Sequence, residues 1–181
     1  MTQYSCQDDY VAAQEGCFQY HTGVTGTIQS YNLAGGAQIQ GQNYKNCIRQ
    51  EEGYCCIQYT VISYAISATT CADATDNRCS GASVCTIDYI LIPNAITSGI
   101  VSYDRFEKYL KSKKNHHRCM PRFCGVNLNA VGFPTSNVPI ITCDLPFEVS
   151  HVTGIESVGS PPAAVTEDGF SIKYSQIAGN C

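Results

Sequence analysis

Short runs of β-branched and aromatic residues, separated by Gly, Asn, Ser and Pro, dominate the chain. Several runs alternate apolar and polar positions, as where Phe147, Val149 and His151 alternate with Glu148 and Ser150. A period of two is typical of strands with one buried face. The predicted strands are Gly26–Tyr31, Tyr44–Gln50, Tyr54–Ile66, Thr86–Ile92, Val138–Cys143, Pro146–Val152 and Gly169–Gln176. Strands at this spacing, without helices between them, predict an all-β protein with an antiparallel sandwich.

Two segments interrupt this pattern, and we expect them to be insertions at about residues 68–84 and 102–119. The first is small and polar, and Cys71 and Cys79 bracket its centre, which predicts a loop closed by its own disulfide. The length of 181 residues suits a single domain, so we expect residues 1–181 to form one domain that carries both insertions.

The second insertion combines an apolar stripe with most of the positive charge. Phe106, Tyr109 and Leu110 are spaced i, i+3 and i+4, which predicts a short helix with one apolar face. Seven of the eleven Lys and Arg residues fall between Arg105 and Arg122. The candidate basic patch consists of Arg105, Lys108, Lys111, Lys113, Lys114, His116, His117 and Arg118. Such a patch either binds an acidic protein surface or a sulfated glycan, or is a solvated loop that protects a sheet edge.

The twelve cysteines indicate an oxidising, extracellular setting, because a reducing cytosol rarely supports so many thiols outside metal sites. Zinc is the competing explanation. The pairs Cys79/Cys85 and Cys119/Cys124 are too widely spaced for a CxxC knuckle. We therefore predict six disulfides. The chain shows no signal-peptide segment and no membrane-spanning run, so we expect a mature secreted chain without a membrane span.

Net charge adds a further exclusion. The formal net charge is −4, whereas a general nucleic-acid binder is normally basic overall. We therefore expect no nucleic acid among the partners of this protein.

Six fragments occur in an order and spacing that resemble the CUB domain, and particularly the secreted CUB-type domains of arthropods. They are GCFQYHTGVTGTIQSYN (16–32), NYKNCIRQEEGYC (43–55), CTIDYILIP (85–93), RFCG (122–125), PFEV (146–149) and GFSIKYSQIAGNC (169–181). Together they extend over most of the chain from Cys17 to Cys181, apart from the two insertions. The resemblance implies a jelly-roll-like antiparallel β-sandwich that serves as an extracellular binding module.

The resemblance also implies two disulfides, Cys17–Cys47 and Cys85–Cys124. Two further pairs, Cys71–Cys79 and Cys119–Cys143, are local predictions from the order of the cysteines. The remaining four cysteines allow three pairings that the sequence leaves open, and they are Cys6, Cys55, Cys56 and Cys181.

Asp88 matches the aspartate that calcium-binding CUB domains carry after their third cysteine. In those domains a glutamate upstream and a second aspartate before the last strand join it, because calcium takes six to eight oxygen ligands. Here residues 80–84 contain no acid, Gly154 stands where the second aspartate is expected, and Glu156 is out of register. The sequence therefore favours Asp88 as a structural acid that accepts hydrogen bonds from a neighbouring loop or hydroxyl. Calcium is not expected as a cofactor, and Asp88 remains the one candidate ligand.

The histidines do not predict a metal site. His116 and His117 are adjacent, so their side chains point in different directions in either regular structure. At most one of them would ligate a metal without help from elsewhere. His21 and His151 are isolated in the sequence, and we expect them to be hydrogen-bonded or on the surface.

The chain also lacks a recognisable catalytic constellation. Ser150, His151 and Asp144 supply the residue types of a triad, but Ser150 and His151 face opposite sides of a strand. No HExxH, GxSxG or P-loop motif is present. We therefore expect a protein that is not an enzyme.

Three hypotheses for function follow. The leading one is a secreted, disulfide-rich extracellular module that recognises a protein or an acidic or sulfated glycan. A second is a carrier of an apolar small molecule such as a pigment or a lipid, since twelve tyrosines supply amphipathic aromatic faces. A third is a structural or matrix protein that assembles with itself, as a homo-oligomer, through strand edges.

Overall fold

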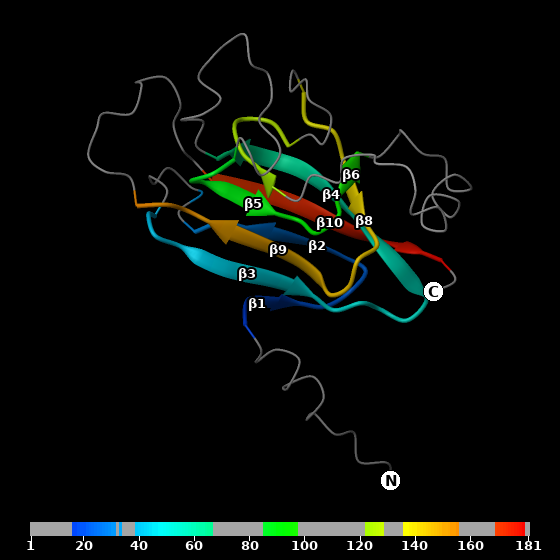
Figure 1. The fold of residues 1–181 in the computed structure, drawn as a ribbon. Coiled ribbons are helices and arrows are strands. Elements are labelled where there is room, and N and C mark those ends of the chain that lie inside the picture. Colours follow the sequence, from blue (N-terminus) through cyan, green and yellow to red (C-terminus); the bar gives the residue numbers. More distant parts are fainter. Residues whose placement is uncertain are drawn as a thin grey trace.

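Ten strands form two five-stranded sheets in the computed structural model, which describes residues 16–31, 33, 39–66, 85–97, 122–128, 136–155 and 169–179. The strands are β1 Cys17–His21, β2 Thr25–Gln29, β3 Asn43–Ile48, β4 Tyr54–Ala65, β5 Tyr89–Leu91, β6 Ile96–Thr97, β7 Arg122–Phe123, β8 Ile140–Thr142, β9 Phe147–Val152 and β10 Gly169–Ala178. The sheet orders are β1-β3-β9-β5-β7 and β2-β10-β4-β8-β6 (Figure 1). The predicted all-β sandwich is confirmed.

Each of the seven predicted strands has a counterpart in the structure, with ends that differ by a few residues. Three further strands are not predicted by the sequence pattern. Of these, β6 and β7 contain two residues each, and β1 shows no alternation of buried and exposed positions. The predicted strand Thr86–Ile92 is shorter in the structure, where β5 begins at Tyr89, directly after Asp88, and ends at Leu91.

Strand pairing departs from the sequence prediction at one place. β1 and β3 run parallel, with Tyr20 opposite Cys47 and His21 opposite Ile48, although antiparallel pairing was expected throughout. The physical reason is the path of the chain. After β1 it crosses to the other sheet as β2 and then returns as β3, so the two neighbouring strands of the first sheet have the same direction.

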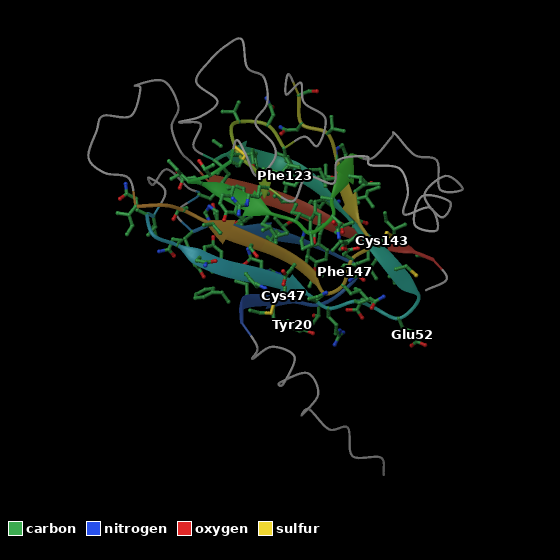
Figure 2. All side chains as sticks on the ribbon, in the orientation of Figure 1. Tyr20, Cys47, Glu52, Phe123, Cys143 and Phe147 are labelled. Carbon is green, nitrogen blue, oxygen red and sulfur yellow. A yellow bond between two sulfur atoms is a disulfide. The ribbon has the colours of Figure 1, made fainter. Side chains whose placement is uncertain are left out.

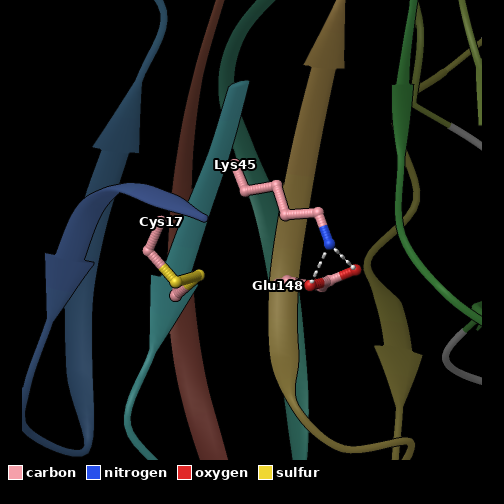
Figure 3. The surroundings of a disulfide bond; sticks show 4 residues. Cys17, Lys45 and Glu148 are labelled. Atoms are coloured by element: carbon pink, nitrogen blue, oxygen red, sulfur yellow. Dashed lines mark hydrogen bonds and ion pairs between the residues drawn. A yellow bond between two sulfur atoms is a disulfide. The ribbon is translucent and has the colours of Figure 1, made fainter. Parts of the chain in front are cut away.

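Three disulfides join described strands and their flanks. Cys17–Cys47 connects β1 to β3 beside the Lys45–Glu148 ion pair, which joins β3 to β9 at 3.0 Å (Figure 3). Cys85–Cys124 is also formed, and both pairs are those that the resemblance implies. In the chain-entropy model, loops of 30 and 39 residues give each bridge about 3–4 kcal/mol of stabilisation.

The predicted Cys119–Cys143 pair is wrong, because Cys143 pairs with Cys56. β4 and β8 are antiparallel with Ile57 opposite Thr142, and this register brings Cys56 and Cys143 to a Cα separation of 4.0 Å. Cys55 is also disulfide-bonded. The predicted Cys71–Cys79 pair and both insertions, including the predicted helix, lie outside the described residues.

The hydrophobic core lies between the two sheets (Figure 2). Alternation along β9 buries Phe147, Val149 and His151 from one sheet, and alternation along β10 buries Phe170 and Ile172 from the other. The two sheets pack against each other through these inner faces. The packed strands therefore fix the positions of the segments that flank them. Among the described residues, no helix long and apolar enough to cross a membrane is found.

Candidate functional site

Three segments that are distant in the sequence meet at one end of the β1-β3-β9-β5-β7 sheet. β9 pairs antiparallel with both of its neighbours, with Val152 opposite Asn43 of β3 and opposite Tyr89 of β5. The residues that precede β3 and β5 therefore lie beside the residues that follow β9. This topology brings together residues 39–42, 87–88 and 153–155.

Hydrogen bonds fix the segment before β3 against the segment after β9. The Thr153 N–H donates to the Gln42 carbonyl at 2.8 Å, and the Gln42 N–H donates to the Thr153 hydroxyl oxygen at 2.7 Å. The same hydroxyl donates to the Ile39 carbonyl at 2.8 Å. The Gly41 N–H donates to the Gly154 carbonyl at 3.1 Å. The backbone of this end is therefore held by four bonds.

Asp88 fixes the third segment. Its Oδ1 accepts a hydrogen bond from the Gly154 N–H at 2.7 Å, and the residue is 6% exposed. The expectation that Asp88 accepts a hydrogen bond from a neighbouring loop therefore agrees with the structure.

Three isoleucines surround this junction and project from it. Ile39, Ile87 and Ile155 are 40%, 39% and 85% exposed, and we call these three residues the isoleucine patch. A Cβ atom at Gly154 would collide with the Ile87 side chain, and one at Gly41 would lie 3.6 Å from Ile155. Gly154 thus leaves room for the Ile87 side chain, whereas a Cβ atom at Gly41 would be in ordinary contact with Ile155.

The family's calcium site does not fit these residues. Position 154 has no Cβ, and the Ile87 side chain occupies the space that a side chain there would need. The Asp88 carboxylate is directed to a backbone N–H. In the described part of the chain, no group of three or more His, Cys, Asp or Glu residues could hold a metal ion.

The other residues that the sequence singled out are spread over the fold. His21 contacts Gln19 at 3.4 Å. His151 is buried and shares a hydrogen bond of 2.9 Å with the Tyr44 hydroxyl, and burial lowers its pKa to about 4. Asp144 is hydrogen-bonded by the Asn94 side chain. The triad residue types are therefore not assembled. The basic patch, from Arg105 to Arg118, lies outside the described residues.

Sequence reasoning named Asp88 and Gly154 but missed the isoleucine patch. Each isoleucine lies in a separate segment, so no local pattern connects them. The available signal is an isoleucine directly beside each of those two residues, Ile87 before Asp88 and Ile155 after Gly154.

Comparisons with solved structures find similar chains at low sequence identity. Similar solved structures include the full extracellular region of zebrafish Gpr126/Adgrg6, at 16% identity over 91% of this chain and 15% of that chain, with a TM-score of 0.48. The CUB1-EGF-CUB2 domains of rat MASP-1 match at 12% identity over 89% of this chain and 43% of that chain, with a TM-score of 0.49. The CUB1-EGF-CUB2 domain of human MASP-1/3 matches at 13% identity over 87% of this chain and 43% of that chain, with a TM-score of 0.46. This chain thus spans less than half the length of each of the three.

The family assignment rests on a different comparison. A search of curated proteins finds no match. The particular resemblance to arthropod domains stays a prediction. A model of the animal CUB domain family, in contrast, matches residues 14–177, which is most of the chain. The protein therefore belongs to the animal CUB domain family.

Proposed function

We propose that this protein is a secreted, non-enzymatic module that binds another extracellular protein through the isoleucine patch. CUB domains are typically extracellular protein-interaction modules and are generally non-catalytic. Disulfide-rich chains of this kind are typical of extracellular proteins. These family properties support binding as the class of function. The isoleucine patch, at one end of the sandwich, is the surface that we propose for this binding.

The exposure of Ile155 carries the proposal. A large aliphatic side chain that is 85% exposed loses hydrophobic stabilisation unless a partner covers it. Ile39 and Ile87 are partly exposed beside it on a backbone that hydrogen bonds hold in place. A rigid apolar centre is typical of the buried core of a protein–protein interface.

The residues around Asp88 and Gly154 favour an apolar contact with the partner, and this contact needs no metal ion. Asp88 is 6% exposed and is bonded to Gly154, so its carboxylate is not presented to solvent. The partner that fits this surface offers aliphatic or aromatic side chains at the centre of the contact.

Site-specific photocrosslinking tests the proposal. A benzophenone amino acid at position 155 is expected to crosslink one defined protein in extracellular fluid of the source, and excess unlabelled wild-type protein should compete for it. A benzophenone at Leu145 is the matched control, since Leu145 is also apolar and 56% exposed but precedes β9. Ile155→Asp should remove the competing ability, whereas Leu145→Asp should keep it.

Three outcomes would contradict the proposal. One is an equal crosslink from both positions, which indicates non-specific capture. Another is full competition by Ile155→Asp. The third is a crosslink between two copies of this chain, with sedimentation showing a dimer, which assigns the patch to self-assembly instead.

A further inference from the structure

A hollow of about 620 Å³ lies over the β2-β10-β4 part of the second sheet. Its lining residues are Gln29, Ser30, Tyr31, Leu33, Ile62, Ser63 and Ser171. Ser171 of β10 is opposite Gln29 of β2 on one side and opposite Ser63 of β4 on the other. Gln29, Ser171 and Ser63 thus form one polar row across three hydrogen-bonded strands. This row forms part of the floor of the hollow.

A β-bulge supplies one apolar wall. The register between β10 and β4 passes from Ser171 opposite Ser63 to Ile172 opposite Val61, so Ile62 is the extra residue of β4. Ile62 is consequently turned out of the regular alternation and is 63% exposed. Bulges are frequent beside binding sites, where they redirect a side chain.

The position of Ser30 is fixed by the backbone around it. Its Oγ accepts a hydrogen bond from the Phe170 N–H at 2.9 Å, and its own N–H donates to the Phe170 carbonyl at 2.9 Å. Gly169 has a φ of +86°, and a Cβ atom there would collide with the Ser30 hydroxyl. Ser30 is 6% exposed, so this hydroxyl is a buried and held component of the lining.

The lining residues have hydrogen-bonding capacity left for a ligand. Ser171 Oγ accepts from Gln29 Nε2 at 3.2 Å, and Ser30 Oγ accepts from a backbone N–H, so each hydroxyl still has its own proton to donate. None of the lining residues is charged.

We propose that this hollow binds a neutral saccharide unit. Sugars combine several hydroxyls, which both donate and accept, with an apolar ring face that fits Ile62 and Leu33. The volume falls within the usual range of roughly 300–1,000 Å³ for ligand sites. A sulfated or phosphorylated ligand would require a cation that the lining lacks. A purely apolar ligand would offer no acceptor to the protons of the Ser30 and Ser171 hydroxyls.

This inference is independent of the proposed protein-binding function, because the hollow and the isoleucine patch share no residue. The test is a titration of ¹⁵N-labelled protein with lactose, maltose, cellobiose and N,N′-diacetylchitobiose, with a sulfated heparin disaccharide for comparison. At least one neutral sugar should shift the amide resonances of Gln29, Ser63 and Ser171. The heparin disaccharide should leave these resonances unshifted.

Two substitutions at exposed positions connect binding to the hollow while leaving the core intact. Ser63→Tyr fills the hollow and should weaken sugar binding by about tenfold or more. Thr27→Tyr is the matched control, because Thr27 is exposed on β2 of the same sheet and does not line the hollow. Its affinity for the sugar should equal that of the wild-type protein. Amide spectra of both variants check that the fold is retained.

Three results would overturn the proposal. One is the absence of shifts at these three amides with every neutral sugar. Another is unchanged affinity in a folded Ser63→Tyr protein. The third is an equal response to the heparin disaccharide, which would show that charge governs binding.

Discussion

The Asp88 carboxylate accepts a hydrogen bond from the Gly154 N–H at 2.7 Å, across 66 residues of sequence. In calcium-binding CUB domains the matching aspartate shares a metal with other acids. In this chain Asp88 instead connects the start of β5 to the end of β9 through its hydrogen bond to Gly154. The contact holds Ile87, which precedes Asp88, beside Gly154, and the hydrogen bonds of Thr153, Gln42 and Gly41 hold the same end of the sheet.

Removal of the Asp88 carboxylate should destabilise the fold moderately. Asp88→Ala leaves the Gly154 N–H without its acceptor and should lower the free energy of unfolding by about 1–3 kcal/mol. Asp88→Asn keeps an oxygen that can accept, so its loss should be smaller. Denaturant unfolding of both variants measures this order. A loss in Asp88→Asn equal to that in Asp88→Ala would show that the hydrogen bond is not the cause.

Gly154 and Ile87 should be energetically coupled. A Cβ atom at position 154 would collide with the Ile87 side chain, so Gly154→Ala should cost about 1–2 kcal/mol of stability. In an Ile87→Ala background the same substitution should cost almost nothing, because the space is then free. A double-mutant cycle of unfolding free energies measures the coupling. Additive losses would mean that the two side-chain positions do not compete for space.

Calcium should have no effect on the stability of this protein. Among the described residues no group of three or more His, Cys, Asp or Glu could hold a metal ion, whereas calcium takes six to eight oxygens. A ligand that binds the native state raises its melting temperature by mass action. Thermal unfolding in excess calcium and in excess chelator should therefore give the same midpoint within about two degrees. A rise of several degrees with calcium would show that acids outside the described residues complete a site.

Local patterns were sufficient to predict most of the fold. The alternation along β9 and β10 identifies the residues that face the core, because a period of two is a property of the strand itself. The pairs Cys17–Cys47 and Cys85–Cys124 followed from a resemblance in the order of fragments.

Features that depend on strand register could not be predicted in this way. Cys56 meets Cys143 only because Ile57 lies opposite Thr142, and no sequence pattern contains that register. The isoleucine patch has the same origin. The absence of an aspartate at Gly154 is visible in the sequence, but the side chain that occupies its space is visible only in the fold.

Gln176 of β10 should be among the most sensitive polar residues. It is 5% exposed, and its Nε2 donates to the Gly23 and Arg49 carbonyls at 3.0 and 2.8 Å. Its Oε1 accepts from the Glu51 N–H at 2.9 Å. Gln176→Ala would remove the side-chain partner of three backbone groups and should cost about 3 kcal/mol, measured by denaturant unfolding.

Gln58 of β4 provides the control for this substitution. Its amide makes only a long contact of 3.5 Å to Thr60, and the residue is partly exposed. Gln58→Ala should therefore change stability by less than about 0.5 kcal/mol. Equal losses at the two positions would indicate a general effect of removing glutamine from a strand.

His151 should make the fold sensitive to acid. Burial lowers its pKa from 6.5 to about 4, so the folded protein resists the proton that the unfolded chain binds. Stability should therefore fall as the pH decreases from about 6.5 to about 4, and this contribution should level off below that. The shift corresponds to a loss on the order of 3 kcal/mol over the window. Denaturant unfolding at a series of pH values measures the slope.

Two substitutions separate the titration of His151 from its packing. His151→Phe keeps an aromatic ring against Tyr44 and Phe170, whose ring centroids lie 5.2 and 5.3 Å away, but it cannot take up a proton. This variant should lose most of the slope between about pH 6.5 and 4. Tyr44→Phe removes the hydroxyl that bonds His151 and keeps the imidazole, so its slope should remain. An unchanged slope in His151→Phe would assign the acid sensitivity to other groups.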